Sequence, residues 1–168
     1  MQREPKDVTF LRMAFEVAMQ GTCIRRRVGC ILVGQHSHVL ATGFNGSPRG
    51  WPHCEDEPCA GADMPSGQGL ELCEAIHAEQ NALIQCAKPM EVETVYCTAS
   101  PCLHCVKLLL NTSCRRVVFL TGYAHGESEE LWTGRPHPDG GDRVWTHLPP
   151  EAIGYSDADI EKLGRRKT

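Results

Sequence analysis

The feature that most constrains this chain is a pair of short motifs separated by one apolar segment. The triplet His77-Ala78-Glu79 stands at the start of one expected helix, and Pro101-Cys102-Leu103-His104-Cys105 stands at the start of the next, with an expected strand over 94–98 between them. A His-x-Glu triplet is common by chance, but Pro-Cys-x-x-Cys is rarer, and the two in this order are specific. The pattern predicts that one imidazole, two thiols and one carboxylate meet at a single site.

These residue types suit a zinc ion that takes part in a reaction. Zinc binds neutral imidazole and thiolates in a tetrahedron, and a catalytic zinc keeps one position for water. His77, Cys102 and Cys105 would supply three ligands and leave that position open. Pro101 is expected at the first helical position, which places both thiols in the first turn, where the helix dipole favours thiolate. Glu79 is not a ligand in this scheme. A closed structural site is the alternative, but it would need a fourth protein ligand.

Length and charge limit the classes of protein that this chain can belong to. At 168 residues it is long enough for one domain with its own core. Its net charge of −4 and its pI near 6.0 argue against a protein that grips long nucleic acid through phosphates. Ten cysteines without an N-terminal secretory pattern are expected to be reduced and partly metal-bound. No run reaches the apolar length of a membrane span, so we expect a cytoplasmic protein.

Hydrophobic periodicity predicts alternating helices and strands. Helices are expected over 8–20 with Asp7 or Thr9 as cap, 75–87 with Ile84 among its core residues, 102–111, 127–132 and 156–163. Strands are expected over 28–33 and 39–44, joined as a hairpin, and over 92–98, 116–120 and 144–148, the last at an edge. Because helix and strand alternate from residue 75 onward, we expect an α/β fold whose partly parallel sheet is covered on both faces.

Two segments that precede the motifs are candidates for ligand contact. The run Arg25-Arg26-Arg27 leads into the strand over 28–33. A solvated edge is its ordinary interpretation, but beside the expected site Arg26 or Arg27 would be placed to bind phosphate. The loop over 43–50 carries glycines that let the backbone approach a ligand, and Asn45 that can hydrogen-bond it. A long turn without chemistry is the alternative.

The segment over 51–73 is expected to be an irregular excursion rich in glycine, proline and cysteine. Loops of this length are usually functional or held in place by something. A second, structural zinc would hold this one through Cys54, Cys59 and Cys73, with Cys23 or His53 as the fourth ligand that closed sites require. Free buried cysteines are the alternative.

The stretch over 23–123 resembles the deoxycytidylate deaminase family of the phage and bacterial kind. The resemblance rests on the basic run that ends in Val28-Gly29, the loop over 43–48, the pair His53-Cys54, the triplet His77-Ala78-Glu79 with Asn81-Ala82, and the motif over 101–105. The motifs match those of the zinc-dependent nucleobase deaminases. Phe44 departs from the family pattern, in which Tyr is common at this position, and the segment over 134–148 matches nothing in it.

The resemblance implies a fold, a reaction and several partners. The fold would be a three-layer α/β/α cytidine-deaminase type with a mixed sheet of about five strands, as one deaminase domain over 1–168 with a Cys-rich insertion at 51–73 and a C-terminal region at 124–168. Zinc and Glu79 as proton shuttle would convert dCMP to dUMP, with Asn45 as a substrate contact and Tyr123 as a wall of the pocket. Family members are usually homo-oligomers, so that a homo-oligomer such as a hexamer is expected, and many members are activated by dCTP and inhibited by dTTP. The alternatives are another cytosine nucleotide or nucleoside as substrate, such as dCTP or cytidine, and a catalytically silent nucleotide-binding regulator.

Overall fold

The protein is built around a mixed five-stranded sheet in the order β2-β1-β3-β4-β5. The computed structural model describes residues 3–65, 68–122 and 126–164. β1 pairs antiparallel with both β2 and β3, whereas β3, β4 and β5 run parallel. The strands are β1 (Gly29–Gly34), β2 (Val39–Phe44), β3 (Val92–Ala99), β4 (Arg116–Thr121) and β5 (Val144–His147). The predicted hairpin and the predicted edge strand are both confirmed.

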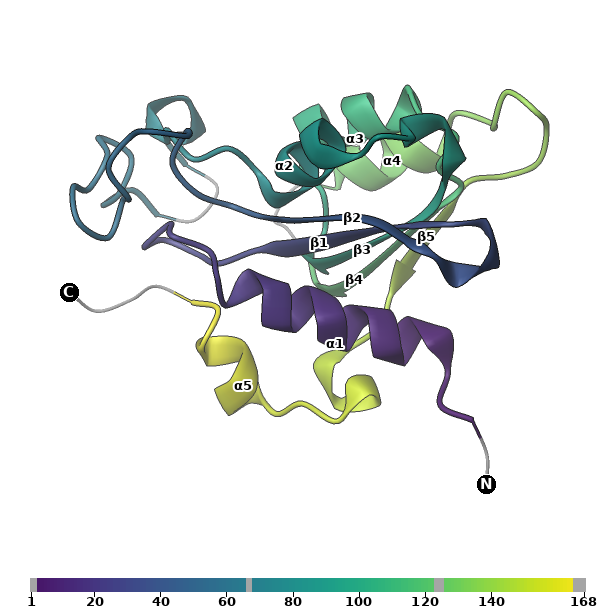
Figure 1. Cartoon of the computed structure of the whole chain (residues 1–168), viewed down its shortest axis with the longest axis horizontal. Coiled ribbons are helices and arrows are strands. Elements are labelled where there is room, and N and C mark those ends of the chain that lie inside the picture. Colours follow the sequence, from purple (N-terminus) through teal and green to yellow (C-terminus); the bar gives the residue numbers. More distant parts are fainter. Residues whose placement is uncertain (1–2, 66–67, 123–125, 165–168) are drawn as a thin grey trace.

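Helices cover both faces of this sheet (Figure 1). α1 and α5 lie against one face, and α2, α3 and α4 lie against the other (Figure 1). The helices are α1 (Lys6–Ala18), α2 (Ala78–Gln85), α3 (Leu103–Leu110), α4 (Glu127–Thr133) and α5 (Asp157–Glu161). Four short 3-10 turns complete the described elements, at Gln35–Ser37, Leu70–Leu72, Pro89–Glu91 and Pro150–Ile153. The expected α/β fold with three layers is therefore confirmed.

Each face of the sheet has its own apolar core. On one face α1 buries five apolar side chains at helical spacing, and these pack on Ile31, Tyr96 and Val118. On the other face Val106 and Leu109 of α3 pack on inward-facing residues of β1, β3 and β4.

Two glycines let the helices approach the sheet closely. A β-carbon at Gly29 would lie 2.0 Å from the carbonyl oxygen of Ala14, and one at Gly43 would lie 2.2 Å from that of Ala78. Helix backbone therefore rests directly on β1 and β2, and this contact fixes where α2 begins.

Three local predictions were wrong. Neither Asp7 nor Thr9 caps α1, because the helix begins at Lys6 behind Pro5 and has no side-chain cap. Pro101 is not the first helical residue, since Cys102 is the N-cap of α3 and Pro101 lies before it. Ile84 is 77% exposed rather than part of the core. The buried positions of α2 are occupied instead by Ala78, Glu79 and Ala82, as expected for a short helix that lies close to β2.

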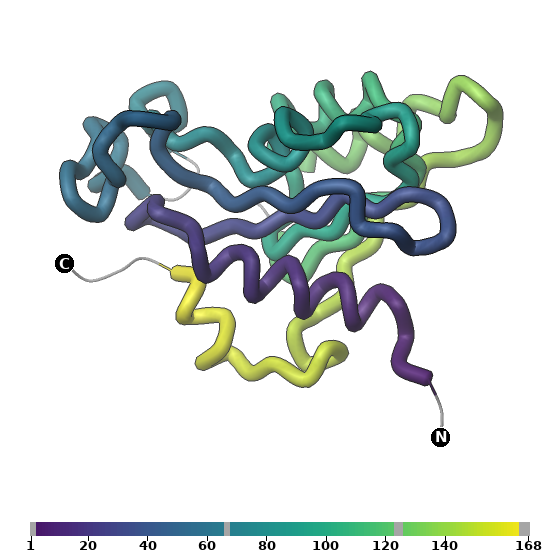
Figure 2. The backbone as a smooth tube through the Cα atoms, viewed as in Figure 1, coloured from purple at the N-terminus to yellow at the C-terminus, as the bar shows by residue number. Residues whose placement is uncertain are grey.

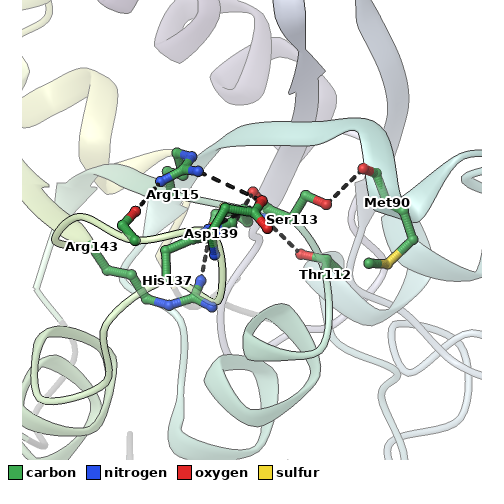
Figure 3. A network of polar contacts seen from close by, with 9 residues as sticks. Met90, Thr112, Ser113, Arg115, His137, Asp139 and Arg143 are labelled. Carbon is green, nitrogen blue, oxygen red and sulfur yellow. Dashed lines mark hydrogen bonds and ion pairs between the residues drawn. The ribbon is translucent and has the colours of Figure 1, made fainter.

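The loop between α4 and β5 is held by a polar network at the N-terminal ends of the parallel strands (Figure 3). His137, only 4% exposed, shares a hydrogen bond of 3.2 Å with the Ser113 carbonyl through Nε2, and its Nδ1 accepts one of 3.1 Å from the Asp139 amide. The Arg115 guanidinium donates to the Gly140 carbonyl at 2.8 Å, and Ser113 Oγ donates to the Met90 carbonyl. None of the helices in the described ranges is long and apolar enough to cross a membrane.

Candidate active site

The two sequence motifs meet at the opposite end of the sheet, where β3 ends. His77 is the N-cap of α2, and its amide donates to Gln80 Oε1 at 2.9 Å, which fixes the start of that helix. An isolated bridge between Gly46 and Ile76 holds the preceding residue against the loop that follows β2. Cys102, the N-cap of α3, follows β3 by three residues, and Cys105 lies one turn farther along that helix. The two helix starts therefore face each other.

The three predicted metal ligands converge. His77 Nδ1 lies 3.4 Å from the Cys102 sulfur and 3.5 Å from the Cys105 sulfur, and all three ligand atoms lie within 4.8 Å of one another. Tetrahedral zinc with Zn–N near 2.0 Å and Zn–S near 2.3 Å requires neighbouring ligand atoms about 3.5 Å apart. The donor set and its spacing therefore fit zinc with one open position.

The electrostatics of this cluster favour thiolate at Cys102. The hydrogen bond from the Cys105 thiol, together with the interactions of His77, lowers the pKa of Cys102 to about 3. The hydrogen bond with Cys102 in turn raises the pKa of His77 to about 9, and it is also the main reason why the pKa of Cys105 is raised. Since thiolate is the form of cysteine that binds zinc, Cys102 is already in the form that a metal requires, and zinc binding would displace the protons held by His77 and Cys105.

Glu79 lies beside the ligands without being one of them. It is the second residue of α2, it is 3% exposed, and burial raises the pKa of its carboxyl group. The carboxyl group also shares a hydrogen bond with Cys105. A carboxyl group held at the edge of a metal site, with little access to bulk water, is suited to move protons.

Glu79, His77 and Cys102 open onto one cavity of about 500 Å³, whereas Cys105 lies buried behind them. This volume lies within the range of small-molecule sites. The residues that line the cavity come from the loops before β1 and after β2, the Cys-rich excursion, the end of β3, the two motifs, and α5 with the residues after it: Cys23, Arg25, Arg26, Val28, Asn45, Met64, Pro65, Leu70, Cys73, His77, Ala78, Glu79, Ala99, Ser100, Cys102, Ile160, Leu163 and Gly164.

Two of the predicted substrate residues line the cavity. Asn45 does so, but both ends of its amide are engaged, since Oδ1 accepts from the Val28 amide at 2.7 Å and Nδ2 donates to the Arg26 carbonyl at 2.8 Å. Arg26 also lines it, and its guanidinium donates to Thr121 Oγ1.

The other two predicted substrate residues do not contribute to the described wall. Arg27 is not among the lining residues, and its Nη1 lies 3.8 Å from the sulfur of Met19. Tyr123 lies outside the described residues.

The second set of cysteines forms two pairs. The sulfur atoms of Cys54 and Cys59 are 3.9 Å apart. A hydrogen bond with the Cys73 thiol is the main cause that lowers the pKa of Cys23 to about 6. Beside Cys54, the carbonyl of His53 accepts hydrogen bonds from the Asp56 and Glu57 amides and so stabilises a turn. Within the described ranges, only the His77 cluster brings three candidate ligand atoms within 4.8 Å of one another.

Sequence reasoning missed several residues of the cavity wall. Arg25 belongs to the predicted basic run, but no feature of the run singled it out. Its Nη2 donates to the carbonyls of Pro65 and Gln68 and so attaches the Cys-rich excursion to the rim of the site. Ile160 and Leu163 were expected only as parts of a terminal helix, and no local signal connects them with a site more than fifty residues away.

The fold and this site define a zinc-binding α/β protein whose ligands sit at two helix starts beside a buried carboxyl group. Residues 4–121 match the family described as the cytidine and deoxycytidylate deaminase zinc-binding region, and the chain belongs to that family. The resemblance of its motifs and the expectation of a zinc cofactor are thereby confirmed.

Known proteins from several sources are similar to the chain. It is 34% identical to deoxycytidylate deaminase of Schizosaccharomyces pombe, over 86% of this chain and 45% of that protein. It is also 34% identical to deoxycytidylate deaminase of Mycobacterium phage D29, over 71% of this chain and 97% of that protein. Deoxycytidylate deaminase of Saccharomyces cerevisiae is 33% identical over 76% of this chain and 41% of that protein, so the chain spans less than half the length of both yeast relatives.

Solved structures share the fold. The crystal structure of dCMP deaminase from cyanophage S-TIM5 in complex with dCMP and dUMP is 25% identical, with a TM-score of 0.61 over 77% of this chain and 92% of that chain. A RibD protein of Acinetobacter baumannii is 20% identical with a TM-score of 0.58, over 94% of this chain and 37% of that chain, and shows the likeness of fold alone.

Proposed function

We propose that this chain catalyses the zinc-dependent hydrolytic deamination of dCMP to dUMP and ammonia. The observation that carries the proposal is the convergence of His77, Cys102 and Cys105 beside the buried Glu79 at the end of one cavity. The relatives named deoxycytidylate deaminase, and the S-TIM5 enzyme in complex with dCMP and dUMP, support dCMP as the substrate.

The residues have separate tasks in this reaction. What zinc supplies, when held by the three ligands, is a water acidic enough to lose a proton near neutral pH. Glu79 accepts that proton and donates it to the ring nitrogen of cytosine as the water oxygen attacks the carbon that bears the amine. Glu79 then takes the second proton from the hydroxyl group newly bound to that carbon and passes it to the amine, which leaves as ammonia while the C=O bond of dUMP forms. The burial of Glu79 keeps the transferred proton from exchanging with bulk water during these steps.

The cavity wall supplies substrate contacts in this proposal. Arg26 is placed to meet the phosphate, because arginine is the side chain best suited to phosphate and this one lines the cavity. Asn45 contributes a face to the wall while it braces the loop before β1 through both ends of its amide. A role for Arg27 would be indirect, through the backbone of the same loop. Tyr123 stays a prediction made from the resemblance.

A structural zinc at Cys23, Cys54, Cys59 and Cys73, with His53 as the alternative ligand, stays part of the proposal. Cys23 of one thiol pair interacts electrostatically with Cys54 of the other, and Cys73 also lines the catalytic cavity, so a metal there would stabilise part of its wall. Metal analysis of the purified protein separates the cases: about two zinc ions per chain would support the second site, and about one would reject it.

The remaining properties are proposed from the sequence and from the resemblance to the family. They are a single deaminase domain over 1–168, a cytoplasmic location, assembly as a homo-oligomer such as a hexamer, and regulation by dCTP and dTTP. Gel filtration with light scattering tests the assembly, and dCMP turnover with added dCTP or dTTP tests the regulation.

A substrate panel tests the proposed reaction. Ammonia release from the zinc-loaded protein is measured with dCMP, dCTP, cytidine and deoxycytidine at equal concentrations. We expect turnover of dCMP with one dUMP formed for each ammonia, and much slower turnover of the other three. Nucleotide binding without ammonia from any of the four would contradict the proposal and favour a catalytically silent regulator.

A further inference from the structure

One wall of the catalytic cavity comes from a part of the chain beyond the family match. That match ends at residue 121, yet Ile160, Leu163 and Gly164 line the same cavity as His77 and Glu79. Ile160 belongs to α5, and Leu163 lies two residues after that helix. The C-terminal segment therefore contributes directly to the space in which a substrate must fit.

This segment is held firmly in place. The carbonyl of Leu163 accepts a hydrogen bond of 2.8 Å from the Arg27 amide, and the Leu163 side chain is 4% exposed. Farther back, Arg12 Nε donates to the Ile153 carbonyl at 2.7 Å, and the rings of Phe15 and Tyr155 pack edge to face at 4.5 Å. Figure 2 shows the segment along α1 and reaching the loop that follows this helix. The wall is thus fixed to the loop that carries Arg25 and Arg26.

The proposed reaction indicates that the wall formed by Ile160 and Leu163 faces the sugar and phosphate end of the substrate. The carbon that loses its amine must lie beside the metal ligands and Glu79, so the sugar and phosphate extend toward the remaining walls. Those walls contain Arg25 and Arg26, and Glu79 is the one acidic side chain among all the lining residues that the structure describes. An apolar cover over these arginines would lower the local dielectric and strengthen their attraction for an anion.

We infer that Ile160 is a specificity-determining residue whose side chain, together with Leu163, closes the phosphate end of the cavity. The closed end admits a nucleoside monophosphate and excludes longer phosphate chains. This inference rests on the proposed deamination of dCMP and names which phosphorylation state of the cytosine nucleotide the site selects. It also explains how a chain with a net charge of −4 can select a phosphate group, since the arginines that bind it are a local pair inside the cavity.

Substitutions at Ile160 test this inference, with a neighbour on the same helix as control. Ile160→Ala opens the wall and Ile160→Trp fills the space in front of it, whereas Glu161 is exposed and absent from the cavity wall, so Glu161→Ala and Glu161→Trp are the matched controls. The measurement is kcat/KM for dCMP and for dCDP, with zinc content and the melting temperature determined for each variant.

We expect Ile160→Ala to raise the ratio of kcat/KM for dCDP to that for dCMP by about tenfold, the effect typical of a small change in pocket shape. Ile160→Trp should lower kcat/KM for dCMP at least about tenfold with zinc content unchanged, and the Glu161 variants should match the wild type. An unchanged ratio in Ile160→Ala, or a loss in Ile160→Trp that is equalled by Glu161→Trp, would overturn the inference.

Binding of the product nucleotides keeps the inference separate from the proposed reaction. Calorimetry with dUMP and dUDP measures the same selectivity without turnover. If the wild type binds dUMP in preference to dUDP and Ile160→Ala loses that preference, the wall is selective even in a protein that releases no ammonia. Equal binding of dUMP and dUDP by the wild type would contradict the selective role of Ile160, whether or not the protein deaminates dCMP.

Discussion

The two ends of the central sheet each carry a cavity with buried polar residues, but the residues are used differently. At the end where β3 finishes, the cavity of about 500 Å³ contains a histidine directed at two thiols and a buried carboxyl group. At the end where β4 begins, a cavity of about 540 Å³ is lined by His137, Arg115 and Asp139. There both ring nitrogens of His137 interact with backbone groups, and Arg115 binds the Gly140 carbonyl.

The difference teaches how to tell a chemical site from a structural one in the same fold. Side chains that hydrogen-bond to backbone groups hold a loop in place, because their bonding capacity is used within the protein. Side chains that converge on one another leave that capacity for a metal or a substrate. The comparison predicts that substitutions at the first end remove activity, and that substitutions at the second end lower stability.

The largest effect is expected for Glu79→Gln. The amide keeps the size of the side chain but cannot accept and return a proton, so dCMP turnover should fall by roughly 100- to 10,000-fold. Zinc content, measured by metal analysis, should stay that of the wild type. The matched control is Glu93→Gln, an exposed carboxylate that lines the cavity at the other end. Substantial dCMP turnover in Glu79→Gln, or an equal loss of turnover in Glu93→Gln, would contradict the difference between the two ends of the sheet.

Next in size is the loss of stability expected for His137→Ala. The substitution removes a buried side chain together with its hydrogen bonds to the Ser113 carbonyl and the Asp139 amide, and the loss should cost about 1–3 kcal/mol. Urea unfolding followed by circular dichroism measures this change. His38→Ala is the control and should be close to neutral, because His38 is an exposed residue with extended backbone that lines the same cavity. A stable His137→Ala protein with reduced kcat would argue for a chemical role of this end instead.

More of the fold than of the site could be predicted from the sequence. The core-facing spacing of α1, the edge position of β5 and the convergence of His77 with Cys102 and Cys105 all depend on local patterns that periodicity and motif spacing report. Positions where a helix backbone lies close to the sheet were harder to predict. Ile84 has the composition of a core residue, yet the backbone of α2 lies so close to β2 that alanines fill the buried positions.

The walls of the cavity could not be predicted for a different reason. Ile160 and Leu163 reach the site only because α5 folds back along α1, which is a property of the packed chain. Asn45 was correctly expected near the site, but the sequence could not show that both ends of its amide are bound to the neighbouring loop. Motif spacing thus predicted the groups that converge at the site, whereas the groups around them are determined by tertiary packing.

A smaller effect, dependent on pH, is expected at Asp7. Burial opposes ionisation of this carboxyl group, but hydrogen bonds from Arg116 and Tyr96 outweigh it and hold its pKa below the ordinary 3.8. Because the folded state has the lower pKa, the ionised group stabilises the fold fully above about pH 3.8 and loses this effect as the pH falls through the folded pKa. Asp7→Asn should therefore cost about 1–2 kcal/mol at pH 7.

Urea unfolding of the wild type and Asp7→Asn at several pH values between 7 and about 2 measures this dependence. The difference between the two proteins should shrink toward the acid end, while dCMP turnover per folded molecule at pH 7 stays unchanged. A difference that grows on acidification would contradict the assignment.

The smallest effect is expected for Glu91→Gln. Its carboxylate pairs with Lys88 Nζ at 2.9 Å, but both side chains are more than half exposed. Exposed ion pairs contribute between about 0 and 1 kcal/mol, so the free energy of unfolding should change by less than about 0.5 kcal/mol. Urea unfolding in low and high salt checks this, and a larger change would mean that Glu91 has a partner other than Lys88 in the cavity that it lines.

The most direct test of the contrast between the two ends is the rate of dUMP formation from dCMP per folded chain, measured with zinc content for the wild type, His77→Ala and His137→Ala. The account predicts that His137→Ala keeps its catalytic zinc and its turnover under conditions in which it is folded, whereas His77→Ala folds but loses both. Normal turnover in His77→Ala, or loss of zinc and turnover in folded His137→Ala, would contradict it.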